Sequence, residues 1–442
     1  MNNKHKVIAT TLLLTACITA SCISELKAQE LKTKKEELVL DIQVRPRAEV
    51  RNGVFTPILE NTNPATFVTQ RSRLGVTYND KKFTTRVNLQ MLNVWGSEPQ
   101  VQRNATNVGL YEAWGELHLS RSSSLRLGRQ VFSYDDERIL GALDWNQAGR
   151  KHDAGLFIFE KSRFKLDVGA AFNQNNEMVA TTTYNDSASQ PYKSMQFVWA
   201  KYKVSEEWAF SALLMNLYMQ HRKDFSLANM QTMGINAFYT KNKISATGSF
   251  YYQLGYNTSK TAAIKSRNAY MAALRVDYAA NKKLTMRLGS DYLSGRNMNS
   301  TSNQTNEFNP LYGTHHKFYG YMDHFYVGNP HSGVGLWDNY CGATLKVKKS
   351  TSFAFMYHHF NAAAQVVDNF GNIISSNLGD EVDFTFSYKV DKSVKLVGGY
   401  SQMVPSPSLK IVKGIISPQV TSPNQSWVWV SLLINPQIIV KK

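Results

Sequence analysis

Period-two alternation is the feature that most constrains the fold of this sequence. In residues 37–51 the even positions are apolar and the odd ones are mostly polar or charged. Such alternation is typical of β-strands with one apolar and one polar face, and it predicts strand structure for most of the chain. The same pattern returns in residues 243–256, 267–278, 284–292 and 381–390.

The connections between these segments alternate in length. Eight are short enough for hairpins, at 79–81, 121–123, 161–162, 205–206, 241–242, 280–282, 348–350 and 391–392. Nine are long and rich in Asn, Ser, Thr and Pro, at 52–65, 96–105, 133–152, 174–191, 220–228, 257–266, 295–332, 362–378 and 405–424. Together they join about eighteen strands, an even number with short turns at one end and long loops at the other.

This rhythm predicts an all-β fold, a transmembrane antiparallel β-barrel with short periplasmic turns and long extracellular loops. Closing the sheet in a bilayer gives every backbone amide a partner. Beyond residue 30 no apolar run approaches the roughly 20 residues of a spanning helix. A soluble β-sandwich or solenoid remains the alternative. Residues 195–202 and 208–219 alternate poorly, and the last strand, near 427–435, does not end in an aromatic residue, so the strand count is open by about two.

Residues 1–28 are predicted to be a secretion signal peptide, with the barrel in residues 29–442. Lys4 and Lys6 precede an apolar stretch, and cleavage is expected after Ala28. A short membrane anchor and a lipoprotein lipidated at Cys17 are the alternatives. Cleavage would remove three of the 50 basic and one of the 33 acidic residues, leaving 47 against 32 and a charge of +15. Cys341 would then be the one cysteine left, so no intrachain disulfide could form.

If the apolar faces of the strands contact lipid, the opposite faces line the lumen of the barrel. The predicted lumen and substrate path contains Arg45, Arg47, Arg51, Arg71, Arg73, Arg86, Arg126, Arg275 and Arg287, with Arg267, Lys165, Lys243, Lys346, Lys389 and Lys395 on the same faces. Guanidinium groups bind carboxylates in a fork, so this lumen is expected to admit anions. Acidic residues, among them Glu49, Glu112, Glu116, Asp167, Asp277, Asp291 and Asp383, are expected there too. The alternative is that these charges only pair with one another and stiffen the wall.

Two long connections carry unusual sequence. One runs from Leu127-Gly128-Arg129-Gln130 through Tyr134-Asp135-Asp136-Glu137-Arg138 to Trp145, Gly149-Arg150 and Asp153. The other runs from His316 to Asp323 and on to Gly335-Leu336-Trp337-Asp338. Together with the strand rhythm, these motifs resemble the alginate-export family of outer-membrane barrel proteins over nearly the whole mature chain.

That resemblance implies a monomeric, eighteen-stranded outer-membrane channel with an electropositive lumen that exports an anionic polysaccharide. It implies that a constriction and its loops are shaped by Arg129, Asp136, Arg138, Trp145, Arg150, Asp153, Asp323 and Asp338. It does not fix the substrate, the direction of transport, the gating or any periplasmic export partner, and neutral sugars or aromatic solutes stay open. A purely structural role, in which Arg-Asp pairs fix a loop folded over the barrel, stays open as well.

Compact catalytic signatures are absent: no Walker loop, GxSxG elbow, HExxH or paired CxxC occurs in the sequence. His315, His316, His324, His331, His358 and His359 gather in the second half, but neighbours on a strand point to opposite faces, so we expect no metal site. A barrel enzyme would need a Ser-His pair near one rim facing lipid, whereas His118 and Ser120 share a lumenal face. The sequence therefore predicts a channel without enzymatic activity or cofactor, with outer-membrane lipid and an anionic solute as partners and no nucleic acid. A less specialised small-anion porin and a loop-based binding protein or adhesin remain the alternatives.

Overall fold

A computed structural model describes residues 36–101, 108–180, 184, 192–221, 226–256, 265–325, 333–415 and 419–441. Its main feature is a closed antiparallel sheet of eighteen strands, in which β1 pairs with β2 on one side and with β21 and β22 on the other. The predicted barrel is therefore confirmed. Its strands are β1 (Glu37–Asn52), β2 (Ala65–Asn79), β3 (Phe83–Val94), β4 (Val108–His118), β5 (Ser123–Gln130), β6 (His152–Lys161), β7 (Phe164–Phe172), β8 (Ser194–Lys203), β9 (Trp208–Gln220), β10 (Leu227–Lys241), β11 (Ile244–Tyr256), β12 (Ser266–Ala279), β13 (Leu284–Leu293), β15 (Leu336–Lys348), β16 (Thr351–Asn361), β19 (Asn377–Lys389), β20 (Val394–Pro405) and β21 (Gln425–Ile434), which β22 (Gln437–Lys441) continues.

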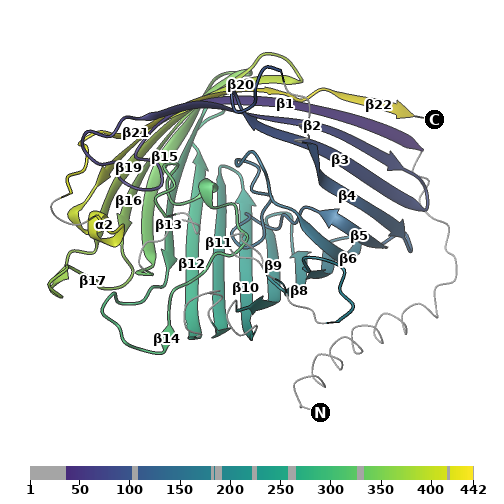
Figure 1. The fold of residues 1–442 in the computed structure, drawn as a ribbon. Helices are drawn as coiled ribbons and strands as arrows, with labels where there is room; N and C mark the ends of the chain where they lie inside the picture. Colours follow the sequence, from purple (N-terminus) through teal and green to yellow (C-terminus); the bar gives the residue numbers. More distant parts are fainter. Residues whose placement is uncertain are drawn as a thin grey trace, which may run out of the picture.

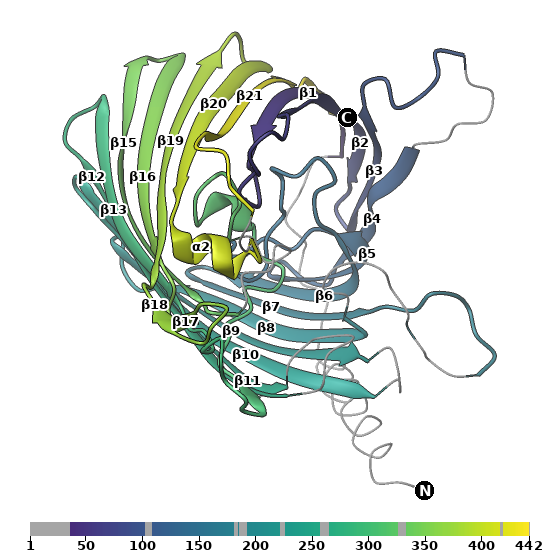
Figure 2. The ribbon, with the colours of Figure 1, turned by 60° about the vertical axis from the view of Figure 1, so that its left-hand side comes forward.

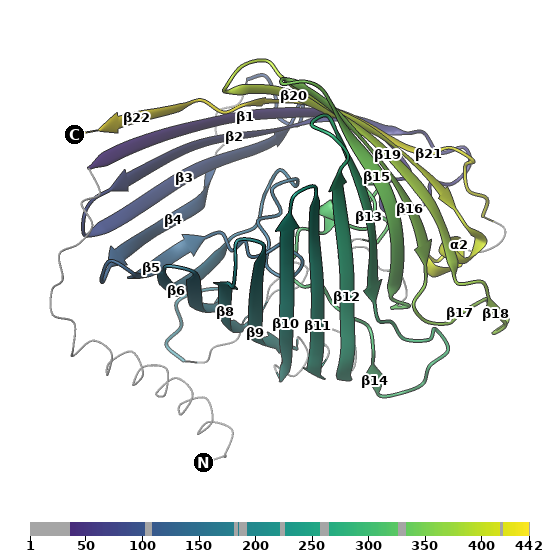
Figure 3. The same ribbon diagram turned by 180° about the vertical axis from the view of Figure 1, so that it is seen from behind.

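Short and long connections alternate around the ring as the sequence predicts (Figures 1 and 3). The short turns join strand pairs such as β12 and β13, while the long loops leave the opposite ends. Small elements lie in the long loops: β14 (Gln304–Thr305), β17 (Val366–Val367), β18 (Ile373–Ile374), the 3-10 helix η1 (His315–Lys317) and α2 (Pro407–Val412). Because outer-membrane barrels have short periplasmic turns, the short-turn end is the periplasmic mouth.

The outward face is apolar and carries aromatic girdles. Leu288 is 66% exposed, as befits a side chain that meets lipid. Near the long-loop ends, Tyr252 of β11 pairs directly with Tyr270 of β12, and Tyr292 of β13 pairs directly with Trp337 of β15. The rings of Tyr270 and Tyr292 are two residues out of register and stack with 5.7 Å between centroids. Tyrosine and tryptophan prefer the boundary between hydrocarbon and water, so this row marks the outer interface of the membrane.

The strands that alternate poorly, β8 and β9, are apolar on both faces. Met195 and Phe197 on β8, and Met215 and Leu217 on β9, point inward and are at most 3% exposed. They belong to one hydrophobic cluster with Ile139 and other residues of the long loops. Part of the lumen wall is therefore covered by infolded loops, which is why a wet inner face is missing there.

The final strand is interrupted once. Before the break, Ile434 of β21 pairs with Val44 of β1. After the break, Gln437 of β22 pairs with Asp41 of β1. Proline at 436 cannot donate to the ladder, but its carbonyl accepts from the backbone amide of Ile42 at 3.1 Å. Residues 438–440 thus extend the strand that closes the barrel.

Two further predictions concern parts of the chain that bear on membrane insertion. No helix among the described residues is long and apolar enough to cross a membrane. The predicted signal peptide, its cleavage site after Ala28 and Cys17 lie outside the described residues.

Candidate channel constriction

Parts of two long loops fold into the ring of strands, where Figure 2 shows them inside the barrel. The first, 131–151, connects β5 to β6, and the second, 294–335, connects β13 to β15. They pair with each other through backbone bonds: Gly141 donates to the carbonyl of Tyr312 at 2.9 Å, and Tyr312 donates to that of Ile139 at 3.0 Å. Ile139 and Leu140 are at most 2% exposed. The loops therefore form one packed unit that narrows the lumen.

Arg138 fixes this unit to the wall. Its guanidinium binds Asp291 of β13 in a fork, with distances of 2.8 and 3.0 Å, and its Nε binds Asp136 at 2.9 Å. It also lies over the ring of Phe318, 4.0 Å from the centroid, in the second loop. The side chain of Arg138 is buried, so both carboxylates depend on it for neutralisation.

Further contacts hold the second loop from the other side of the barrel. The backbone amide of Met322 donates to Glu381 Oε1 of β19 at 2.8 Å, and its carbonyl accepts from the amide of Phe55 at 2.8 Å. His316 Nδ1 lies 2.9 Å from Asp323 within the loop. From the first loop, Arg150 donates to the carbonyl of Gly313 at 2.8 Å.

The most positive part of the lumen is a cluster of three arginines around one carboxylate. Asp144, at the inner end of the first loop, lies 2.8 Å from Arg71, 3.2 Å from Arg45 and 3.7 Å from Arg73. Burial raises the pKa of Asp144, but Arg71 and Arg45 more than offset this, so the pKa lies below its usual value. One carboxylate faces three guanidinium groups, and the arginine cluster keeps a surplus of two positive charges.

The guanidinium groups of this cluster lie behind its carboxylate. The Asp144 side chain is 61% exposed and meets the water of the lumen, whereas the three arginine side chains behind it are at most 9% exposed. Within the described residues, Nη2 of Arg73 has no hydrogen-bond partner. The Arg73 guanidinium stacks on Tyr111, 3.5 Å from the ring centroid. A Cβ on Gly149, which has a φ of +64°, would lie 2.8 Å from the Tyr111 ring and 2.9 Å from Arg73, so a glycine is needed there.

An aromatic cluster lies beside the arginines. Trp145 stacks on His316 with 4.4 Å between ring centroids. The guanidinium of Arg47 also lies over the Trp145 ring, 4.2 Å from its centroid. Trp427 and Trp429 of β21 meet Trp145 edge-on. Stacked rings next to guanidinium groups can bind both the apolar faces and the charges of an acidic sugar.

The structure places all nine arginines of the predicted substrate path on the inward face of the wall, but most are paired. Arg47 and Arg51 share Glu49, Arg86 contacts Asp41 and Glu112, Arg126 contacts Glu116, and Arg275 and Arg287 share Asp277. Most of the inward arginines are therefore neutralised by neighbouring carboxylates. This agrees with the alternative that these charges pair with one another and stiffen the wall. The uncompensated charge is concentrated at Arg45, Arg71 and Arg73.

Two of the residues assigned to the constriction by resemblance lie elsewhere, and that part of the prediction is wrong. Arg129 and Asp153 face each other on β5 and β6 in a fork of 2.8 and 2.9 Å, on the side opposite buried Gln130 and His152. They therefore lie on the outer face. The alternation of β5 continues without a register shift, so Arg129 shares the outer face with Leu127, whereas Arg126 and Gln130 face inward.

The other constriction residues lie inside the barrel but in separate contacts. Asp136, Arg138 and Trp145 belong to the packed loop unit, Arg150 binds its backbone at Gly313, and Asp323 contacts the His316 side chain. Asp338 is not part of a loop: it lies on β15, buried, and accepts from His358 at 3.0 Å. Asp144, Tyr111 and Glu381 are absent from the residues predicted from the sequence, although Asp144 directly precedes the predicted Trp145.

Histidine chemistry is dispersed. His358 faces inward to Asp338, whereas His359 faces outward to Asp380 at 2.8 Å. In the described parts of the chain no group of three or more His, Cys, Asp or Glu side chains is placed to hold a metal ion. His331 lies outside the described residues. His118 contacts Thr84 at 3.3 Å, and Ser120 contacts Ser123 at 2.8 Å, so each of these two residues has a partner of its own.

Solved structures with the same fold are bacterial outer-membrane proteins. OccAB4 from Acinetobacter baumannii has a TM-score of 0.59 and 10% identity, covering 92% of this chain and 100% of that one. OpdK from Pseudomonas aeruginosa, also solved with vanillate, has a TM-score of 0.61 and 9% identity, with coverage of 91% and 99%. A BenF-like porin from Pseudomonas fluorescens has a TM-score of 0.61 and 12% identity, with coverage of 93% and 100%. At such identities the likeness establishes the fold.

Family membership rests on the sequence itself. No curated protein matches the chain. Residues 37–410, however, match the model of the family described as Alginate export, which covers most of the chain and all but the last barrel strand. The family and the similar structures are outer-membrane channels rather than enzymes. The chain therefore belongs to the alginate export family and is an outer-membrane β-barrel channel.

Proposed function

We propose that this protein is a monomeric, anion-selective channel that carries an acidic polysaccharide from the periplasm to the cell surface after removal of residues 1–28. The observation that carries the proposal is the arginine cluster of Arg45, Arg71 and Arg73 around Asp144. It combines a surplus of positive charge close behind the wall surface with one carboxylate exposed to the lumen, and the buried Nη2 of Arg73 has no hydrogen-bond partner among the described residues. Anions entering a narrow, low-dielectric passage are stabilised by such fixed charges, while cations are repelled.

The neighbouring aromatic cluster supports a sugar as the solute. Trp145 offers a stacked indole, and its backbone carbonyl is held by Arg47 at 2.8 Å. A chain of uronate residues presents a carboxylate and an apolar ring face in each unit, which suits adjacent arginines and indoles. The second candidate is a porin for small anions, favoured by the compactness of the three-arginine site. Vanillate in OpdK is such a small carboxylate.

Ion selectivity in planar bilayers tests the proposal. Under a salt gradient the reversal potential should show a preference for chloride over potassium. Replacing Arg45 and Arg73 together by Gln should lower the anion-to-cation permeability ratio, since each lost charge is worth about 1 kcal/mol, roughly a fivefold change. Arg129→Gln is the matched control, because it removes one arginine charge from the outer face and should leave the ratio unchanged. Cation preference in the unaltered protein would reject the mechanism.

The reverse change should raise selectivity. Asp144→Asn keeps the shape of the side chain but removes the carboxylate that offsets the arginine cluster. We expect the anion-to-cation permeability ratio to increase by roughly fivefold, again from about 1 kcal/mol per charge. A ratio that falls or stays constant in this variant would show that the cluster does not face the conducting path. Inhibition of the current by polygalacturonate, compared with dextran and with vanillate, separates the polysaccharide channel from the small-anion porin.

A further inference from the structure

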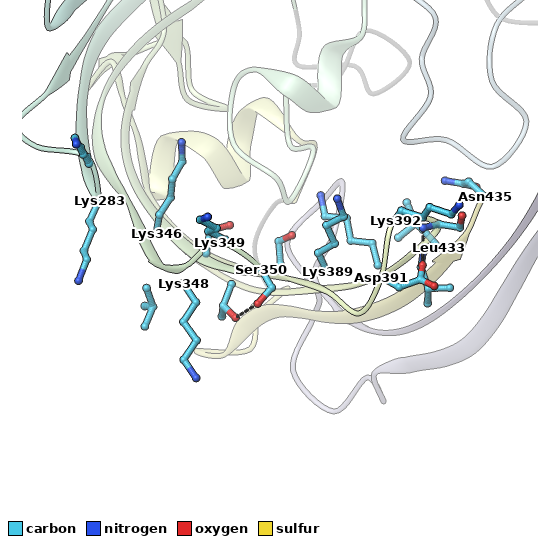
Figure 4. Close-up of a pocket in the computed structure, with 18 residues that line it drawn as sticks. Lys283, Lys346, Lys348, Lys349, Ser350, Lys389, Asp391, Lys392, Leu433 and Asn435 are labelled. Atoms are coloured by element: carbon cyan, nitrogen blue, oxygen red, sulfur yellow. Dashed lines mark hydrogen bonds between the residues drawn. The ribbon is translucent and has the colours of Figure 1, made fainter. Parts of the chain in front are cut away.

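A recess full of lysines lies at the periplasmic mouth, apart from the constriction. Three consecutive short turns, β12–β13, β15–β16 and β19–β20, border it, and its volume is about 660 Å³ (Figure 4). We name it the lysine mouth. Its lining contains one carboxylate, Asp391, and eight lysines, which are Lys282, Lys283, Lys346, Lys348, Lys349, Lys389, Lys392 and Lys395.

The lysines of this recess are not paired. Within the described residues none of the eight forms an ion pair with a carboxylate, unlike most lumen arginines. Asp391 is already used by its own turn, where its Oδ1 accepts from the amides of Ser393 at 2.6 Å and Val394 at 3.0 Å. The surplus charge of the lysine mouth therefore needs an outside partner.

The placement of these lysines costs stability. Lys389 and Lys395 are direct cross-strand partners on β19 and β20, and like charges directly opposite each other destabilise a sheet. In Figure 4 the side chains of Lys346 and Lys389 point into the barrel, whereas Lys348 points away from it. Neighbouring strands are about 5 Å apart, so the inward amines are spaced about 5 to 10 Å along the wall. These closely spaced lysines repel one another and do not stabilise the barrel. Their spacing suits a ligand with repeated negative charges.

Other short turns show the contrast. Lys165 pairs with Glu160 at 2.8 Å, Lys203 with Glu206 at 2.6 Å, and Lys241 with Glu207 at 3.5 Å. Those turns lie on the other side of the barrel, between β6 and β11. Lys81, Lys82, Lys161 and Lys243 in other short turns also form no ion pair among the described residues, but the lysine mouth gathers eight such lysines around one recess.

We propose that the lysine mouth is a docking site that binds the acidic polysaccharide before it enters the pore. This inference rests on the proposed function and assigns it a first binding step on the periplasmic side. Ammonium groups are strongly hydrated point charges on flexible stems, so they suit many weak, exchanging contacts with a sliding polyanion better than one fixed anion. Long-range attraction by a one-signed patch also raises the rate of encounter.

Binding of labelled polygalacturonate oligomers to the full-length protein in nanodiscs tests this proposal. The triple variant Lys346→Gln, Lys389→Gln and Lys395→Gln should weaken binding about tenfold or more, and added salt should weaken binding to the unaltered protein steeply. The matched control is Lys165→Gln, Lys203→Gln and Lys241→Gln, which removes the same charge from the paired turns and should change binding less than twofold. Equal losses in both variants, or no loss in the first, would overturn the docking site.

The two experiments distinguish an error in the docking site from an error in the proposed channel function. An anion-selective channel whose lysine-mouth variant binds polygalacturonate as the unaltered protein does would refute the docking site alone. A channel without anion selectivity that still loses binding in the variant would refute the proposed pore mechanism and keep the docking site. Binding of polyglutamate without binding of polygalacturonate would overturn the polysaccharide assignment in favour of an acidic protein partner.

Discussion

Replacing Arg138 by Met should release the two infolded loops from the barrel wall. Met fills a similar volume but leaves Asp291 and Asp136 buried without a cation. Breaking a buried ion pair from one side costs about 3 to 5 kcal/mol, because the remaining charge is desolvated and unpaired. The eighteen strands hold one another by backbone hydrogen bonds, so the barrel should stay closed while the loops swing out. We expect higher and noisier conductance and faster cleavage by chymotrypsin near Trp145.

A rescue variant separates loss of the ion pair from loss of packing. Adding Asp136→Asn and Asp291→Asn to Arg138→Met removes the unpaired buried charges, and replacing a buried ion pair by neutral groups is often close to neutral for stability. The triple variant should therefore recover most of the protease resistance of the loops. Slow cleavage and ordinary conductance in Arg138→Met itself would mean that the hydrophobic cluster alone holds the loop unit.

The barrel could be predicted from the sequence because its determinants are local. Alternation in segments such as residues 37–51 and 284–292 reflects the two faces of a strand, and each short turn carries its own polar signal. A bilayer then leaves closure as the way to satisfy the strand edges. These rules need no knowledge of which side chains meet in space.

The constriction could be predicted only in part because it depends on long-range contacts. Arg138 and Asp291 are 153 positions apart, and nothing local to either residue shows that they meet. Arg129 was assigned to the constriction by resemblance, although the alternation of β5 places it on the outer face with Leu127. The apolar inner faces of β8 and β9 were visible as poor alternation, but their meaning depended on loops that pack there.

The same distinction between local pattern and long-range contact applies to the inward arginines. The list of inward arginines follows from alternation, since each lies on the face opposite the lipid-facing residues. Which of them keep a net charge depends on partners: Glu49 neutralises Arg47, whereas Asp144 serves three arginines at once. The electrostatic character of the pore is therefore a property of the folded loops as much as of the strands.

Acidification should open the same constriction. Burial lowers the pKa of His315 to about 3, with Arg150 adding to the effect and a backbone bond to Pro310 opposing it. Burial likewise lowers the pKa of His324 to about 3, with Lys413 adding and Gly53 opposing. Both residues lie in the second infolded loop, so the packed loop holds them neutral, while a released loop lets them take up protons near their ordinary pKa of about 6.5.

The sign follows from linkage. Each histidine has a lower pKa in the packed state, so the packed state is fully stable above about pH 6.5 and loses stability as the pH falls toward 3. At pH 5 the two together favour release by about 4 kcal/mol, because one pKa unit corresponds to 1.36 kcal/mol per group. Channel conductance should therefore rise between pH 6.5 and 5. His315→Gln with His324→Gln should flatten this rise, whereas His359→Gln on the outer face should not. A conductance that is constant across this range would show that the loop unit stays packed despite its histidines.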